Sequence, residues 1–204
     1  MGQFRLEPSA EGSHLAPEGA ADVADFEREA ARLAAGEADA DSFTSFRTMR
    51  GVYAQRQDGF YMVRVKIPLG RLAAPQAERL AEVSASFARG WLRVTTRQDM
   101  ELHWVRLEKI PDVMRRLGEV GLTTREACGN AVRNVTACPL AGICPYEAFD
   151  VTPFALSTAQ YFLRHPLVQA LPRKFKIAFS GCRRDCAFAS IHDVVAVAVV
   201  RRQG

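Results

Sequence analysis

Two pairs of cysteines are the residues of this chain whose type and spacing best suit chemistry. Cys138 and Cys144 enclose five residues in NVTACPLAGICPYEAFD, and Cys182 and Cys186 enclose three in FSGCRRDCAF. Iron–sulfur clusters are commonly held by four cysteine thiolates. Zinc uses the same ligands, usually in tight loops of about two to four residues. The wide first pair favours a loop around a larger object such as a 4Fe–4S cubane, with zinc and buried unmetallated thiols as the alternatives.

The charge of the chain is divided unevenly. Residues 1–42 hold 3 Arg and 10 Asp or Glu, whereas residues 43–204 hold 24 Lys or Arg and 13 Asp or Glu. A basic body suits an anionic partner, cofactor or oxyanion substrate, and a solvated basic surface is the plainer explanation. The sequence shows no secretion signal and no apolar run of about eighteen residues, so we expect a cytoplasmic protein without a membrane span.

The elements that must position these residues can be predicted from hydrophobic periodicity. Residues 1–42 have the composition of an acidic mobile leader with at most one short helix. Residues 43–122 show, in order, a strand, a helix, two short strands and an amphipathic helix, within 59–70, 73–89, 91–105 and 108–121. That order predicts an α+β fold with a ferredoxin-like half-domain.

A further domain is expected over residues 123–204. Its pattern predicts a helix over 152–166, a strand over 174–182 and a last apolar strand near the end of the sequence. Lys174 and Lys176 alternate along the middle strand, so both would face one side while Phe175 and Ile177 face the core. Such a lysine pair could bind an anion and deliver protons, or form a solvated strand face.

Several stretches beyond the cysteines resemble the sirohaem-dependent nitrite and sulfite reductases. LRVTTRQDMELHWV, GNAVRNVTACPLAG, FDVTPFA and LPRKFKIAFSGC occur in the order found in that family, over roughly residues 43–204. The resemblance implies a ferredoxin-like half-domain followed by a mixed α/β domain that binds sirohaem and a 4Fe–4S cluster. It also implies an oxidoreductase that reduces sulfite to sulfide or nitrite to ammonia with six electrons.

The resemblance assigns roles to individual residues. The residues that match the cluster ligands are Cys138, Cys144, Cys182 and Cys186, and the last of these matches the thiolate shared with the sirohaem iron. The residues that match substrate-facing cations are Lys174, Lys176, Arg97, Arg64 and Lys66. The residues expected near the acidic macrocycle are Arg97, Arg133 and Asn134. Cys128 stands outside both pairs and is expected to be a spare thiol.

The sequence departs from the family in ways that leave its organisation open. Known members contain two copies of this unit, and this chain contains one, with first-copy segments and cluster cysteines together. It is therefore expected to be the front half of a longer enzyme, or a one-copy reductase completed by a homodimer or second half-subunit. The same sequence would also suit a cluster-only electron-transfer protein, or a non-catalytic half that supplies basic residues to a partner. No flavin or nicotinamide fingerprint is present, which implies a separate donor such as ferredoxin or a reductase subunit. Nucleic acid is not an expected partner.

Overall fold

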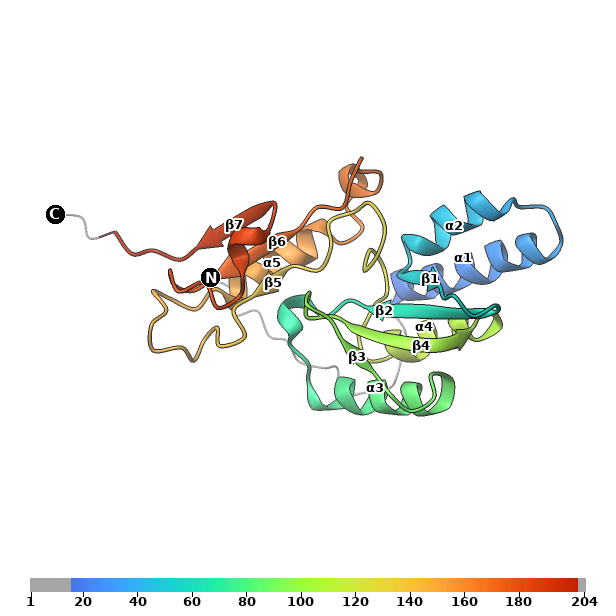
Figure 1. Ribbon diagram of the computed structural model, residues 1–204, viewed down its shortest axis with the longest axis horizontal. Helices are drawn as coiled ribbons and strands as arrows, with labels where there is room; N and C mark the ends of the chain where they lie inside the picture. The colour runs from blue at the N-terminus through green and yellow to red at the C-terminus, as the bar shows by residue number, and fades with distance from the viewer. Residues whose placement is uncertain (1–15, 202–204) are drawn as a thin grey trace. The chain divides into compact units, whose positions relative to one another are not determined.

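The computed structural model describes residues 16–201, which divide into two compact units (Figure 1). The first unit consists of the described residues up to Lys66 with Leu72–Thr95 and Met100–Gly129. The second unit consists of Ile67–Arg71, Thr96–Asp99 and the described residues from Asn130 onward. No helix within residues 16–201 has both the length and the apolar character needed to cross a membrane.

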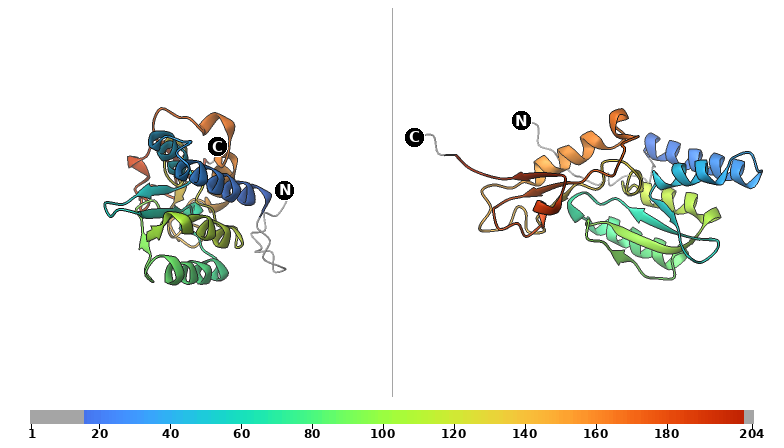
Figure 2. Two further views of the ribbon diagram at one scale, coloured as in Figure 1. Left: turned by 90° about the vertical axis from the view of Figure 1, so that its right-hand side faces the viewer. Right: turned by 45° about the horizontal axis from the view of Figure 1, so that its top comes forward.

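The first unit is built on a four-stranded antiparallel sheet in the order β1–β2–β4–β3. Its strands are β1 (Val52–Ala54), β2 (Phe60–Val65), β3 (Arg93–Val94) and β4 (Met100–Arg106). The helices α3 (Ala74–Phe87) and α4 (Ile110–Gly118) cover one face of the sheet (Figure 2). A short turn η2 (Leu107–Lys109) leads into α4. Alternate residues Val63 and Val65 of β2 are fully buried. The α+β prediction and the expected order of elements over residues 59–121 are confirmed.

Two further helices, α1 (Pro17–Ala34) and α2 (Ala40–Thr48), belong to the same unit. Phe26 of α1 is fully buried and its ring lies 6.0 Å from that of Phe43 and 5.9 Å from that of Phe46. Helix α1 also contacts α4. The structure therefore differs from the expected mobile leader, because the few apolar residues of this acidic segment fall on one face of a helix. The part of the expected leader over residues 1–15 lies outside the described residues.

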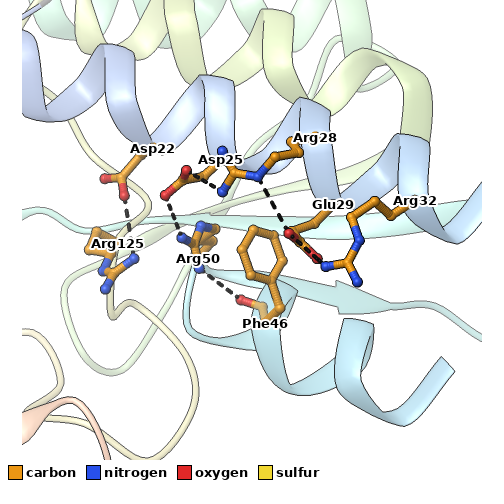
Figure 3. Close-up of polar contacts among 8 residues, drawn as sticks. All are labelled: Asp22, Asp25, Arg28, Glu29, Arg32, Phe46, Arg50 and Arg125. Atoms are coloured by element: carbon orange, nitrogen blue, oxygen red, sulfur yellow. Dashed lines mark hydrogen bonds and ion pairs between the residues drawn. The ribbon is translucent and has the colours of Figure 1, made fainter. Parts of the chain in front are cut away.

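Ion pairs reinforce the attachment of α1. Asp22 and Asp25, one turn apart, face Arg125 and Arg50, with oxygen–nitrogen distances of 3.3 Å in both pairs (Figure 3). Burial lowers the pKa of Arg50, and the neighbouring Arg125 acts in the same direction. The two aspartates thus supply the negative charge that two adjacent arginines need at this point of the first unit.

The second unit contains a parallel three-stranded sheet in the order β5–β6–β7. The strands are β5 (Thr136–Ala137), β6 (Ile177–Ser180) and β7 (Val194–Val197), accompanied by helix α5 (Thr152–Phe162) and the short turns η1 (Pro68–Gly70), η3 (Pro166–Val168) and η4 (Ala189–Ile191). Small and branched side chains fill its core, among them Val132, Val135, Ala137, Ala155, Ala159 and Ile177. Since the strands are parallel, their first residues share one edge of the sheet and their last residues share the other.

The strand expected over 174–182 is shorter in the structure. It begins at Ile177, and Phe175 makes only an isolated bridge to Val132. Ile177 is buried as expected, but Phe175 is 37% exposed, so its predicted place in the core is wrong. Alternation predicted a buried side chain, but this position lies before the first residue of β6 and is exposed.

Candidate functional site

The two cysteine pairs meet at the carboxyl edge of the parallel sheet. Cys138 directly follows β5, and Cys182 follows β6 after a single glycine. Neighbouring parallel strands end side by side, so the loops that carry Cys144 and Cys186 start from adjacent places. Cys138 is buried, Cys144 and Cys182 are half-buried and Cys186 is exposed. The four thiols of the two pairs thus belong to one edge of one unit.

Backbone contacts hold the two cysteine loops together. The Cys138 amide donates to the Phe179 carbonyl at 3.1 Å, and the Ala148 amide donates to the Gly181 carbonyl at 2.8 Å. A Cβ atom at Gly181 would lie 2.9 Å from Cβ of Glu147, closer than side chains tolerate. Only glycine therefore allows the first loop to cross so near to the second.

The other three thiols of the two pairs belong to the electrostatic environment of Cys138. Burial raises the pKa of its thiol, and the thiols of Cys186, Cys144 and Cys182 act in the same direction, opposed by a hydrogen bond from the Leu140 amide. Within residues 16–201, no three His, Cys, Asp or Glu side chains gather as they would around a single metal ion. Four cysteine thiols at one edge of one unit are the kind of ligand set that iron–sulfur clusters commonly use.

An open hollow of about 590 Å³ lies beside these loops. Its lining includes Cys182 and both arginines that follow it, together with Tyr146 of the first cysteine loop. The guanidinium of Arg184 stands 3.4 Å above the Tyr146 ring centroid, a cation–π contact between the two loops. The cysteine edge therefore has a cationic, partly aromatic border.

The predicted basic residues of the second unit lie at the opposite edge of its sheet. Arg133 and Asn134 precede β5, and Lys174 and Lys176 precede β6. The six residue-to-residue steps from Lys176 to Cys182 correspond to roughly 20 Å of extended chain. Lysines and cysteines therefore do not touch within this unit, and a group that meets both sets must reach beyond the sheet.

Arg97 lies within the second unit among backbone carbonyls and charges. Its Nη2 donates to the Asn134 carbonyl at 2.6 Å and to the Ile177 carbonyl at 3.4 Å. Burial lowers the pKa of Arg97 to about 10, with Asp99 acting to raise it and Arg133 to lower it. Arg97 is therefore still a cation at neutral pH, and Arg97 and Arg133 form one cationic neighbourhood.

Asn134 and Gln98 position the backbone around this neighbourhood. The fully buried Asn134 amide donates to the Ile67 and Arg97 carbonyls at 2.7 and 2.9 Å. Gln98 binds both backbone groups of Ala137, donating at 2.7 Å and accepting at 3.2 Å. Gln98 thereby fixes the residue just before Cys138. Sequence reasoning did not identify it, although it directly follows Arg97 in the stretch TTRQ.

The two lysines of the second unit differ from the other predicted cations. Lys174 is exposed and Lys176 is half-buried. The backbone amide of Lys176 donates to the Asp193 carboxylate at 2.8 Å. In the part of the chain that the structure describes, neither ammonium group takes part in an ion pair. Both ammonium groups are therefore available to an anion.

Arg64 and Lys66 belong to the first unit and are each held by a carboxylate. Nε and Nη2 of Arg64 lie 3.1 and 2.6 Å from Oε1 of Glu101. Nζ of Lys66 lies 3.5 Å from Oε2 of Glu126, and these side chains are only 4% and 0% exposed. The structure thus brings Arg97 and Arg133 together in the second unit and places Arg64 and Lys66 in the first. A role of Arg64 and Lys66 toward a substrate stays a prediction.

Comparison with known proteins defines the family. Residues 53–120 match the nitrite/sulfite reductase ferredoxin-like half domain, and residues 128–204 match the nitrite and sulphite reductase 4Fe-4S domain. The two matches follow each other in the order of the two units and leave out only the N-terminal part and a short joint. The chain belongs to the nitrite and sulfite reductase family.

Individual relatives share this relationship over most of the chain but over a small part of their own length. An assimilatory ferredoxin-dependent nitrite reductase of Haloferax mediterranei is 38% identical over 165 residues, 74% of this chain and 28% of the relative. A sulfite reductase [ferredoxin] of Mycobacterium tuberculosis is 34% identical over 73% of this chain and 30% of the relative. The solved structure of Mycobacterium tuberculosis NirA aligns with a TM-score of 0.74 and 32% identity, covering 80% of this chain and 33% of that one. The chain thus spans less than a third of these curated relatives.

Proposed function

We propose that this chain forms part of a sirohaem- and 4Fe–4S-dependent reductase that converts sulfite to sulfide or nitrite to ammonia with six electrons. The observation that carries the proposal is the meeting of two cysteine pairs at one edge of a parallel sheet. Family membership supports it, since the second unit matches a 4Fe-4S domain of nitrite and sulphite reductases.

The residues that would hold the cofactors are Cys138, Cys144, Cys182 and Cys186. The exposed Cys186 is the thiolate best placed to serve a second group as well, as its match to the shared ligand implies. When bound, the coupled cluster and sirohaem would supply the redox chemistry, with the electrons coming from a separate donor. The Leu140 amide stabilises the Cys138 thiolate, and hydrogen bonds to cluster sulfurs are one of the protein's means of setting reduction potential.

Two lysines and a cationic neighbourhood of the second unit are proposed to act on the anion. Lys174 and Lys176 attract sulfite or nitrite and donate protons as oxygen leaves as water. Arg97 and Arg133, with the amide of Asn134 holding their segments, supply fixed positive charge for the anion and for the carboxylates of the macrocycle. Arg64 and Lys66 are further candidates for contact with the substrate anion. Their carboxylate partners would have to be displaced or shared when the anion binds.

Further protein is proposed to complete the site on the second unit. Of the seventeen exposed large apolar side chains among residues 16–201, fifteen belong to this unit. Surfaces of this kind mark interfaces. A second half of the enzyme, as a further segment, subunit or second copy, is proposed to cover it. Ferredoxin is proposed as electron donor by similarity to the ferredoxin-dependent relatives. A cytoplasmic location stays a prediction of the sequence.

The experiment that tests the cluster is anaerobic reconstitution followed by iron analysis. About four irons per chain are expected for a cubane, and Cys144→Ser should lower this value. Cys128→Ser is the matched control, because Cys128 is buried in the first unit and should leave the iron content unchanged. Stoichiometric zinc without iron would contradict the proposal.

A visible spectrum then separates the reductase from a protein with the cluster alone or with neither cofactor. Protein produced with sirohaem biosynthesis intact should show a Soret band and long-wavelength haem bands once the complete assembly has formed. A broad shoulder without haem bands in that assembly would indicate a cluster-only electron carrier instead. Neither feature would indicate a half that only supplies basic residues.

A further inference from the structure

A chain of alternating charges joins α1 to the end of β2 inside the first unit. Asp22 Oδ1 lies 3.3 Å from Arg125 Nη1, Arg125 Nε lies 3.9 Å from Glu126 Oε1, and Glu126 Oε2 lies 3.5 Å from Lys66 Nζ. The four side chains are 12%, 17%, 0% and 4% exposed in that order. Because water is largely excluded, each charge acts on its neighbour more strongly than it would at a surface.

Glu126 is the shared member of this chain. One of its oxygens faces Arg125 and the other faces Lys66, so the two cations compete for one carboxylate. Its backbone is fixed at a φ of 57° and its amide donates to the Met49 carbonyl at 2.7 Å. Because the Glu126 side chain is fully buried, its carboxylate has little room to move, and its division between the two cations depends on what holds Arg125 from the other side.

We propose that Asp22 is a positioning residue for Lys66: by holding Arg125 it leaves the Glu126 carboxylate to Lys66 and thereby sets where the ammonium group stands. Without the charge of Asp22, Arg125 moves toward Glu126 and the grip on Lys66 weakens. Helix α1 then supports a candidate site residue as well as the core. We call this series of ion pairs from Asp22 to Lys66 the relay. It depends only on the first unit, whereas its effect on an anion rests on the proposed function of Lys66.

Helix α1 contains its own control residue. Asp25 lies one turn from Asp22, and its Oδ2 is 3.3 Å from Arg50 Nη2. Arg50 in turn donates to the Phe46 carbonyl, so this second branch leads toward α2 and not to Glu126 (Figure 3). Asp25→Asn therefore removes the same charge from the same helix and can act on Arg125 only indirectly, through the neighbouring Arg50, so it should affect the relay less than Asp22→Asn.

A double-mutant cycle on the full chain tests the relay without any activity assay. Both tryptophans, Trp91 and Trp104, lie in the first unit, so denaturant unfolding followed by their fluorescence reports on that unit. Asp22→Asn and Lys66→Met together should give an unfolding constant that differs from the product of the single effects by at least about fivefold, equivalent to about 1 kcal/mol. Asp25→Asn with Lys66→Met should deviate by less than about twofold. Deviation below twofold for the Asp22 pair as well would overturn the relay.

A second measurement covers the case in which Lys66→Met does not fold. Here Lys66 is kept, and the NMR resonance of its side-chain Cε is compared between the parent and each aspartate variant. It should shift in Asp22→Asn and stay in place in Asp25→Asn. The same Lys66 resonance in both variants would overturn the proposal. Turnover of a folded Lys66 variant in the complete assembly tests the substrate role separately. If the double-mutant cycle shows coupling but the Lys66 variant turns over substrate at the parental rate, the relay is supported and Lys66 no longer belongs to the proposed active site.

Discussion

The two units of the chain differ in how completely they satisfy their own side chains. Only Trp91 and Val94 of the seventeen exposed large apolar residues described lie in the first unit, and all the others lie in the second. The first unit also gives Arg64 and Lys66 carboxylate partners, whereas the ammonium groups of Lys174 and Lys176 form no ion pair with the described residues. The first unit thus pairs and buries its own side chains more completely than the second, which is the unit proposed to be covered by further protein and to bind the anion.

The largest contrast is expected between two phenylalanines. Phe26→Ala removes a fully buried ring from the first unit and should lower its free energy of unfolding by about 3–5 kcal/mol. Phe175→Ala removes a ring that is 37% exposed and should cost the isolated chain much less, about 1 kcal/mol or below. Chemical denaturation, followed by tryptophan fluorescence for the first and by circular dichroism for the second, measures both. Equal losses would erase this distinction between the two units.

A similar contrast is expected between lysines. Lys66→Met removes the nearer of the two cations that face the fully buried Glu126 and should destabilise the first unit by about 3–5 kcal/mol. Lys174→Met removes an exposed charge that has no ion-pair partner among the described residues, so a change within about 0.5 kcal/mol is expected. Thermal unfolding of the two variants under one buffer condition gives the comparison. Tolerance of Lys66→Met would mean that its ion pair contributes little to the fold.

Much of this architecture could be predicted because it depends on local patterns. The strands and helices of residues 59–121 follow from periodicity, whereas the shared edge of the cysteines depends on the parallel pairing of β5 with β6, which local patterns do not give. The leader prediction failed because composition averages over a helix and hides that Val23 and Phe26 lie on one buried face. The prediction for Phe175 failed because alternation gives the side of a strand and not whether that side is covered.

The parts of the candidate site that escaped prediction depend on contacts between distant segments. Gln98 binds the backbone of Ala137, thirty-nine residues away, and no sequence pattern reports such a contact. The carboxylates opposite Arg64 and Lys66 are likewise distant in sequence, so a pattern that identifies two cations does not reveal that each is already paired. Residue type and spacing thus predicted candidates, while the structure supplies their partners.

The lysines whose replacement should leave stability unchanged, Lys174 and Lys176, are expected to matter for turnover. Lys174→Met and Lys176→Met should keep fold and iron content but lower the rate of sulfite or nitrite reduction in the complete assembly by about 10²-fold or more, because proton delivery is lost. Lys109→Met, on η2 of the first unit, is a control for the loss of one positive charge. Parental rates in both variants would make the lysine pair a solvated face and leave the anion to other residues.

The smallest expected effect concerns the carboxylate that neutralises Arg64. Burial acts to raise the pKa of Glu101, but hydrogen bonds from Arg64 and His103 outweigh it and hold that pKa below the ordinary value of 4.5. A carboxyl group whose pKa is lower in the folded state stabilises the fold above its unfolded pKa, and this contribution is lost as the pH falls through the folded pKa. Glu101→Gln should therefore cost the first unit about 1–2 kcal/mol at neutral pH.

This cost should shrink as the pH is lowered below the ordinary glutamate value, because the parental carboxylate then becomes protonated and loses the same attraction. Denaturant unfolding at a series of pH values, followed by tryptophan fluorescence, measures the difference between parent and variant. Glu82→Gln is the control, since its side chain is 52% exposed in its pairs with Arg79 and Arg116 and should show little pH-dependent difference. A Glu101→Gln cost that stayed constant with pH would show that shape and hydrogen bonding, and not charge, hold Arg64. The ion pairs of the first unit would then contribute less to its stability than their number indicates.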